Sequence, residues 1–214
     1  ATTEIYTLSL HDALPISVGH LRVSERRCYW SRCTFCVQNA KYDDPRAPSA
    51  RELFDTAGAL ARIEAFVGAG YRVLYFADEA LAPAQLRVLC RALVERGLAA
   101  RLRWACRAKL EHAFADVELA RLLHAAGCRE MLFGLETTSP RLQHMMAKYT
   151  AGLDEAAVER ILRTLDAAGV GTHVNLLSGF PGERPHELVA TVDFTTRVLS
   201  ELRNATFLLN RFDL

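Results

Sequence analysis

Short apolar segments alternate with longer amphipathic segments along this chain from Gly19 onward. The short segments, rich in leucine, β-branched and aromatic residues, predict strands at 20–24, 71–76, 102–106, 129–135, 170–177 and 205–212. The longer segments predict helices at 49–70, 83–97, 116–127, 154–169 and 184–202. Such alternation indicates βαβ units and a parallel sheet, either an open doubly wound sheet or a barrel.

Several of the expected helices carry end signals. Ser49 and Glu52 form a capping-box pattern at the start of the first helix. Pro83 suits the first turn of the second helix. Asp116 is a candidate N-cap for the third helix, and Gly127 is a candidate stop.

Polar residues follow the carboxyl end of nearly every expected strand. In chain order they are Cys28, Cys33 and Cys36; Asp78 and Glu79; Arg107; Glu136 and Thr137; Asn175 with segment 178–183; and Asn210 with Arg211. Each one alone is a plausible helix cap or solvated charge. Because strand ends in a (β/α) barrel converge on one rim where active sites are built, the series favours a partial six-stranded (β/α) barrel with parallel strands.

Composition narrows the class of protein. A net charge of +1 gives no basic field for a nucleic-acid partner, so none is expected. No apolar run approaches a membrane span, and the N-terminus lacks the features of a signal peptide. The chain has 6 cysteines, and three of them fall within the stretch RRCYWSRCTFC. That clustering suggests metal binding rather than a disulfide framework, in a reducing, cytoplasmic setting.

The first residues have a different origin from the rest. Segment 1–16 is a one-frame translation of a common sequencing-library adapter, so we expect it to be non-native and exclude it from fold reasoning. We expect 17–214 to be one core domain, truncated at its N-terminus and with a C-terminus that also shows no capping or tail signal.

Cys28, Cys33 and Cys36 place three thiols on one short loop. Cysteine thiolates suit zinc or an iron–sulfur cluster, and three protein ligands leave one metal position open for catalysis. A structural zinc site would need a fourth ligand, for which His20 is the nearest candidate. The alternative to an enzyme is therefore a non-catalytic metal-binding or redox-sensing barrel. Cys90, Cys106 and Cys128 lie in helix or strand patterns and are expected to be ordinary buried residues.

Four motifs, CYWSRCTFC, FADEA, FGLET and LLSGFPGE, occur in this order, each after an expected strand or late within one. Together they resemble the radical S-adenosylmethionine (radical SAM) superfamily over nearly all of the expected native part. The resemblance implies a four-iron four-sulfur (4Fe-4S) cluster held by three cysteines, with S-adenosylmethionine on the open iron. It also implies reductive cleavage of S-adenosylmethionine to a 5′-deoxyadenosyl radical, with a reductant such as flavodoxin or ferredoxin as partner.

The resemblance also implies roles for individual residues. The cluster ligands would be Cys28, Cys33 and Cys36. The residues expected near S-adenosylmethionine are Phe35, Asp78, Glu79, Arg107, Glu136, Thr137, Asn175, Gly179, Pro181 and Gly182. Asp78 and Glu79 would contact the methionine amino group, and Arg107 is a plausible carboxylate partner.

One spacing departs from the commonest family pattern. Four residues, rather than three, separate Cys28 from Cys33. Together with the late LNRF, CYW and CTFC are reminiscent of members that carry an N-terminal cobalamin-binding domain, some of which modify ribosomal peptides. Cobalamin-dependent methylation or peptide modification is thus an expectation by analogy. The sequence does not identify the substrate.

Overall fold

A computed structural model of the chain describes residues 18–24, 28–37 and 55–212. The expected adapter segment 1–16 and the capping box at Ser49 and Glu52 lie outside the described residues.

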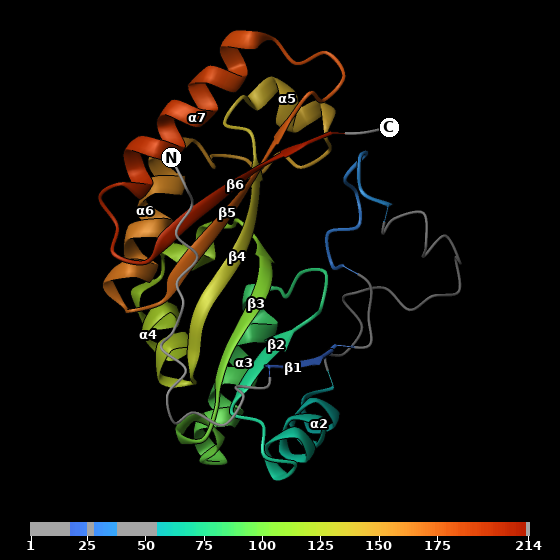
Figure 1. Cartoon of the computed structure of the whole chain (residues 1–214), viewed down its shortest axis with the longest axis vertical. Coiled ribbons are helices and arrows are strands. Elements are labelled where there is room, and N and C mark those ends of the chain that lie inside the picture. The colour runs from blue at the N-terminus through green and yellow to red at the C-terminus, as the bar shows by residue number, and fades with distance from the viewer. Residues whose placement is uncertain (1–17, 25–27, 38–54, 213–214) are drawn as a thin grey trace, which may run out of the picture.

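Six parallel strands form one sheet in the order β1-β2-β3-β4-β5-β6, so each strand pairs with the next along the chain (Figure 1). The strands are β1 (Val18–Leu21), β2 (Val73–Phe76), β3 (Arg103–Lys109), β4 (Cys128–Glu136), β5 (Gly171–Ser178) and β6 (Ala205–Arg211). Within the described ranges β1 and β6 do not pair with each other, which leaves the sheet open. This sequential order is that of a partial barrel, and it excludes the doubly wound alternative, in which the strand order reverses.

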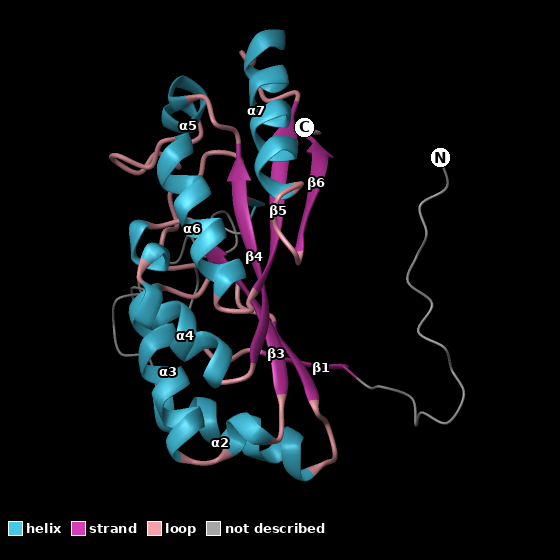
Figure 2. Cartoon of the chain, turned by 90° about the vertical axis from the view of Figure 1, so that its left-hand side faces the viewer, coloured by secondary structure: helices cyan, strands magenta, loops and turns pink. Residues whose placement is uncertain are grey.

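Helices follow the strands and cover one face of the sheet (Figure 2). They are α2 (Thr56–Gly68), α3 (Pro83–Glu95), α4 (Val117–Ala125), α5 (Pro140–Met145), α6 (Glu155–Ala167) and α7 (Pro185–Leu199), with short 3₁₀ turns η1 (Leu98–Ala100) and η2 (His112–Ala115). None of the helices in the described part of the chain has both the length and the apolar character needed to cross a membrane.

Local chemistry explains the helix ends. Asp55 and Asp116 accept hydrogen bonds from backbone N–H groups in the first turns of α2 and α4, which satisfies donors that a helix start leaves free. Gly127, which ends the α4 region, has φ of +95°, and a Cβ there would lie 2.6 Å from the Leu102 carbonyl oxygen. Only glycine fits this turn into β4.

The main core lies between the helices and the covered face of the sheet. Trp104 stacks on Phe76 with ring centroids 4.8 Å apart, and its indole N–H donates to the Ala126 carbonyl at 2.8 Å. Burial of each such ring contributes about 2–3 kcal/mol. Cys90, Cys106 and Cys128 are free thiols buried here, as their helix and strand patterns predict.

Several elements differ from the sequence expectations. Strand β1 spans Val18–Leu21 rather than 20–24, and α2 begins after its N-cap Asp55 rather than at Ser49. Helix α5 falls in the stretch 136–153, for which no helix was expected, because six residues are too few to show a helical period. Its N-cap Ser139, followed by Pro140, is nevertheless a typical start signal. Strand β3 runs on to Lys109, beyond the expected end at Cys106, and so carries two further polar residues to the rim of the sheet.

Candidate cofactor site

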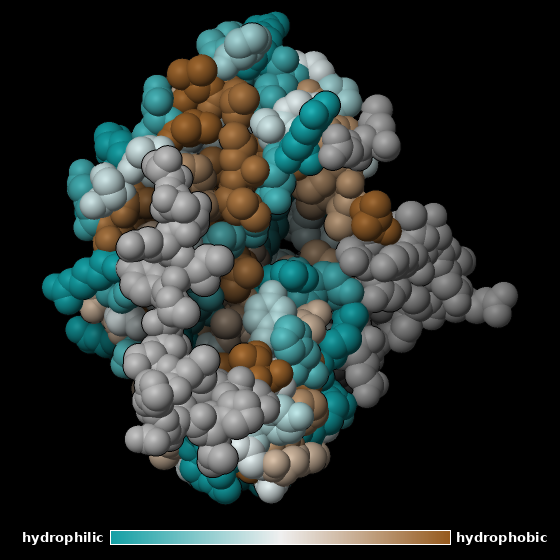
Figure 3. Space-filling model, in the orientation of Figure 1, coloured by the Kyte–Doolittle hydropathy of each residue, from teal (hydrophilic) through white to brown (hydrophobic). Residues whose placement is uncertain are grey.

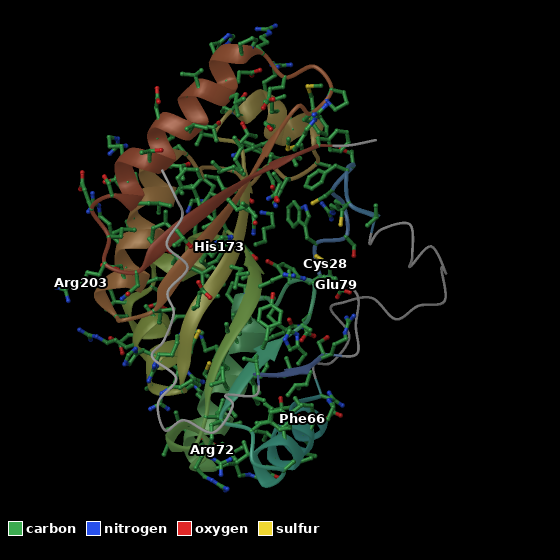
Figure 4. The ribbon with its side chains drawn as sticks, viewed as in Figure 1. Cys28, Phe66, Arg72, Glu79, His173 and Arg203 are labelled. Atoms are coloured by element: carbon green, nitrogen blue, oxygen red, sulfur yellow. The ribbon has the colours of Figure 1, made fainter. Side chains whose placement is uncertain are left out.

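A cavity of about 360 Å³ lies between the cysteine loop (28–37) and the carboxyl ends of the strands. Its lining comprises the three clustered cysteines and residues from β3, β4, β5 and β6: Cys28, Trp30, Cys33, Phe35, Cys36, Glu79, Ala80, Arg107, Ala108, Lys109, Leu132, Gly134, Glu136, Lys148, Asn175, Leu177 and Asn210. The space-filling view shows the surface hollowed between its upper and lower parts (Figure 3). Cys28 and Glu79 are labelled at this side of the sheet in Figure 4.

Cys28, Cys33 and Cys36 form no disulfide among the described residues, are half-buried, and all line the cavity. Burial raises the pKa of the Cys33 thiol to about 11, although the charge of Lys148 opposes that rise. Within the described residues, no set of three His, Cys, Asp or Glu side chains is gathered closely enough to ligate one metal ion. Three soft donors around one cavity fit a larger group, the iron–sulfur type, better than a single zinc ion.

The cysteine loop is held against the end of α5. Thr34 donates from its backbone N–H to the Met146 carbonyl at 3.1 Å and from its hydroxyl to the Met145 carbonyl at 3.0 Å. The Trp30 indole N–H donates to the Ala147 carbonyl at 2.8 Å. A helix end leaves its last carbonyls without intrahelical partners, so three consecutive carbonyls here become the docking point of the loop.

An aromatic cluster supports the loop on the other side. Phe35 packs edge-on against Phe180, with ring centroids 6.4 Å apart, and Phe180 packs against Phe212 at 5.5 Å. Leu142 and Leu177 belong to the same apolar group. Because Phe35 immediately precedes Cys36, this packing fixes the third cysteine relative to β5.

The adjacent acids Asp78 and Glu79 lie in different places. Asp78 is 1% exposed, and its two carboxylate oxygens accept from the backbone N–H groups of Val23 at 2.9 Å and Ser24 at 2.8 Å. Burial raises the pKa of Asp78, and the two N–H donors oppose that rise. Glu79 lines the cavity and pairs in bidentate fashion with Arg22, at 2.8 and 2.7 Å. Asp78 therefore ties down the start of the cysteine-bearing segment and does not line the cavity.

The pair Glu136 and Thr137 divides in the same way. Glu136 has φ of +64° and lines the cavity, where its Oε1 lies 2.6 Å from the Lys148 Nζ. Thr137 is 1% exposed, and its hydroxyl lies 3.2 Å from that of Thr191 on α7. The Gln143 amide also donates to the Thr137 carbonyl at 2.8 Å. Thr137 thus joins β4 to α7 and does not line the cavity.

Two further cavity residues lie on β3 and β5. The Arg107 guanidinium lies 5.6 Å from the Tyr75 ring centroid, a cation–π contact that aims it across the open face of the sheet. Asn175 accepts from the Asn210 amide at 3.4 Å, so the two amides form a polar wall on β5 and β6. His20, the candidate fourth zinc ligand, instead packs on Tyr75 at 5.4 Å and is not among the cavity residues.

Gly179, Pro181 and Gly182 belong to the loop between β5 and α7 and are not among the cavity residues. The Gly179 N–H donates to the Glu183 carboxylate at 2.6 Å, and the Gly182 carbonyl accepts from Arg141 at 2.8 Å. Phe180 of this loop contacts the cavity residue Phe35.

Sequence reasoning missed two lysines of the cavity, Lys109 and Lys148. The rarity of lysine is the signal that the sequence offers, because only three of the 26 Lys and Arg residues are lysine and two of those three line this cavity. Burial lowers the pKa of Lys109 to about 8.

Comparison with known proteins identifies the family to which the chain belongs. Residues 26–195 match the family model of the Radical SAM superfamily. No curated protein sequence gives a significant match.

Several solved structures are similar in fold. One is the radical S-adenosylmethionine methyltransferase TsrM from Kitasatospora setae, with cobalamin and a [4Fe-4S] cluster bound. It is 26% identical over 90% of this chain and 36% of that chain, with a TM-score of 0.71. The cobalamin-dependent S-adenosylmethionine radical enzyme OxsB is 19% identical, with 87% of this chain and 27% of that chain covered and a TM-score of 0.63. Coproporphyrinogen III oxidase (HemN) from Escherichia coli is 15% identical, with 92% of this chain and 43% of that chain covered and a TM-score of 0.55.

The chain therefore spans about a third of the length of TsrM and less of OxsB. The likeness to OxsB and HemN shows the fold alone, and it agrees with the partial (β/α) barrel expected from the strand and helix pattern.

Proposed function

Since the chain belongs to the Radical SAM superfamily and is a radical SAM enzyme, we propose that it holds a 4Fe-4S cluster and S-adenosylmethionine in this one cavity. One observation carries the proposal: Cys28, Cys33 and Cys36 line the same cavity as polar residues from four strand ends. A non-catalytic barrel that binds zinc would need the cysteines but not the polar strand-end residues around the same cavity.

Each cysteine supplies one thiolate ligand, and three thiolates leave one iron of the cluster open. When bound, the cluster supplies a single electron to the sulfonium of S-adenosylmethionine. The hydrogen bonds from Thr34 and Trp30 to the end of α5 would keep the loop and its three cysteines in place. The apolar wall of Phe35 and Leu177 limits the access of water to the thiolates.

We assign the S-adenosylmethionine contacts to the polar groups that line the cavity. Glu79 offers a carboxylate to the amino group of the methionine part, and Arg107 offers a guanidinium to its carboxylate. Glu136 and Asn175 offer acceptors to the ribose hydroxyls. The Phe35 backbone would lie near the adenine.

Five other candidates take supporting roles in this assignment. Asp78 and Thr137 hold the backbone that carries their neighbours. Gly179, Pro181 and Gly182 shape the loop that presents Phe180 to Phe35. In this assignment the three loop residues support S-adenosylmethionine binding through the position of Phe180 and not by direct contact with the cofactor.

The finer reaction class rests on analogy. TsrM is a methyltransferase that binds cobalamin, and OxsB is cobalamin-dependent, so we propose cobalamin-dependent methylation or peptide modification by the protein to which this segment belongs. In this proposal residues 17–214 form its radical SAM core, a flavodoxin or ferredoxin delivers the electron, and the reaction takes place in the cytoplasm.

Anaerobic reconstitution with iron and sulfide tests the proposal. We expect about four iron atoms per chain, a reducible EPR signal, and 5′-deoxyadenosine released from S-adenosylmethionine after reduction with dithionite. Cys33→Ala should lose both signal and product. Cys90→Ala is the matched control, because Cys90 is a buried thiol on α3 that does not line the cavity.

A tightly held zinc ion in place of iron would contradict the proposal, as would a reducible cluster that survives in Cys33→Ala. Added cobalamin and a methyl-accepting substrate test only the finer reaction class.

A further inference from the structure

Lys109 and Lys148 place two ammonium groups beside the cysteine loop. Lys109 lies near the Trp30 ring and Lys148 near the Phe35 ring. The Lys109 Nζ lies 4.1 Å from the Trp30 ring centroid, and the Lys148 Nζ lies 5.8 Å from that of Phe35. Both lysines line the cavity together with all three cysteines. Apart from Lys41, all other Lys and Arg positions of the chain are arginine.

The two lysines differ in their counter-charges. Lys148 is neutralised by Glu136, since Nζ and Oε1 are 2.6 Å apart. Lys109 is 5% exposed, and its Nζ contacts the Thr150 hydroxyl and, at 3.5 Å, the Leu110 carbonyl. No carboxylate of the described residues forms an ion pair with it.

A buried ammonium group with no carboxylate in direct contact is costly. The Trp30 ring and the more distant charge of Glu111 offset part of this cost, and negative charge placed in the cavity would offset more of it. Three thiolates give a 4Fe-4S cluster a net negative charge, and a further negative charge is added when the cluster is reduced. A fixed positive charge nearby therefore stabilises the reduced form more than the oxidised form.

We propose that Lys109 is a positioning residue whose charge, held in no ion pair with a described carboxylate, raises the reduction potential of the cluster, while Lys148 contributes less because its ion pair with Glu136 weakens its field. The proposal rests on the cluster site proposed above. The step itself is the transfer of one electron from a low-potential external donor, dithionite in the test, to a cluster core that passes from the 2+ to the 1+ state. No covalent bond forms or breaks.

EPR-monitored redox titration of the reconstituted protein, without S-adenosylmethionine, tests this. Lys109→Met should shift the midpoint potential to a more negative value, and Lys109→Arg, which keeps the charge, should restore most of it. Lys148→Met should shift the potential less than Lys109→Met. Arg121→Gln is the control and should leave the potential unchanged, because Arg121 pairs with Glu118 on the exposed surface of α4.

Glu136→Gln gives an independent test of the opposite sign. It leaves Lys148 uncompensated, so the potential should become more positive. This variant keeps the proposal testable even if Lys109→Met fails to fold.

Equal potentials in the wild type and Lys109→Met, at equal iron content, would overturn the proposal, and so would a negative shift in Glu136→Gln. Failure of the cluster site is a separate outcome, because the wild-type protein itself would then show no reducible iron.

Discussion

Two pairs of neighbouring residues, Asp78 with Glu79 and Glu136 with Thr137, follow strands β2 and β4, and each pair is split between two environments. One member lines the cavity with the cysteines, and the other is buried against backbone or helix. Asp78 and Glu79 lie beyond the end of β2 at Phe76, and Glu136 has a left-handed φ of +64°, so the split follows from the local turn at each strand end. In the proposed assignment, polar residues at the same rim therefore serve two purposes, cofactor contact and support of the rim itself.

Loss of the Asp78 carboxylate should have the largest effect on stability. Asp78→Ala leaves two buried N–H groups, of Val23 and Ser24, without acceptors, which should cost about 3 kcal/mol. Urea unfolding monitored by circular dichroism measures it. A loss no larger than that of Glu79→Gln would break the distinction between the two acids.

A second support, Glu187 on α7, should make the scaffold sensitive to acid. Hydrogen bonds from Arg141 hold the pKa of Glu187 at about 2, with contributions from Ser139 and the Arg184 N–H. Because the folded pKa lies below the ordinary value, the stabilisation is complete above about pH 5 and is lost as the pH falls toward 2.

Glu187→Gln should therefore lower the free energy of unfolding at neutral pH by about 2 kcal/mol and flatten its dependence on pH between 5 and 2. Unfolding midpoints measured across that range check this. If the free energy of unfolding of Glu187→Gln fell as steeply between pH 5 and 2 as that of the wild type, a group other than Glu187 would cause the acid sensitivity.

Removal of the Thr137 hydroxyl should have a smaller effect. Thr137→Val keeps the side-chain shape but loses the contact with the Thr191 hydroxyl and the acceptor for the Ser139 N–H, which should cost about 1–2 kcal/mol. Thermal unfolding measures the loss. The affinity for S-adenosylmethionine should change little, and a loss of affinity at unchanged stability would reverse the assignment.

Glu79→Gln, a change on the cavity side, should have the smallest effect on stability. The Glu79–Arg22 pair is partly exposed, so Glu79→Gln should cost less than about 1 kcal/mol. Its affinity for S-adenosylmethionine should fall about tenfold, equivalent to about 1.4 kcal/mol of lost contact. Calorimetry with the reconstituted protein measures it. Unchanged affinity would remove Glu79 from the site.

The sequence was sufficient to predict the sheet, because six apolar segments of strand length alternate with amphipathic ones and the Gly127 turn is unambiguous. It also placed Cys28, Cys33 and Cys36 together on one loop. It could not separate Asp78 from Glu79, because both follow the last strand residue, Phe76, and the sequence does not fix the path of the turn that orients them.

Other features depended on tertiary contacts. Helix α5 is too short to show a period, yet its exposed carbonyls anchor Trp30 and Thr34. Lys148 follows that helix and reaches the cavity only because the chain turns back toward Glu136. No local pattern in the sequence predicts a contact of that kind.

The central claim is that the cavity side of these strand ends binds the cofactor while the other side supports the rim. Its most direct test is the S-adenosylmethionine affinity of Asp78→Asn and Glu79→Gln, each reconstituted with a cluster and assayed at a temperature where both are folded. The account predicts near wild-type affinity for Asp78→Asn and a clear loss for Glu79→Gln. The reverse order, with Asp78→Asn losing affinity and Glu79→Gln retaining it, would contradict the account.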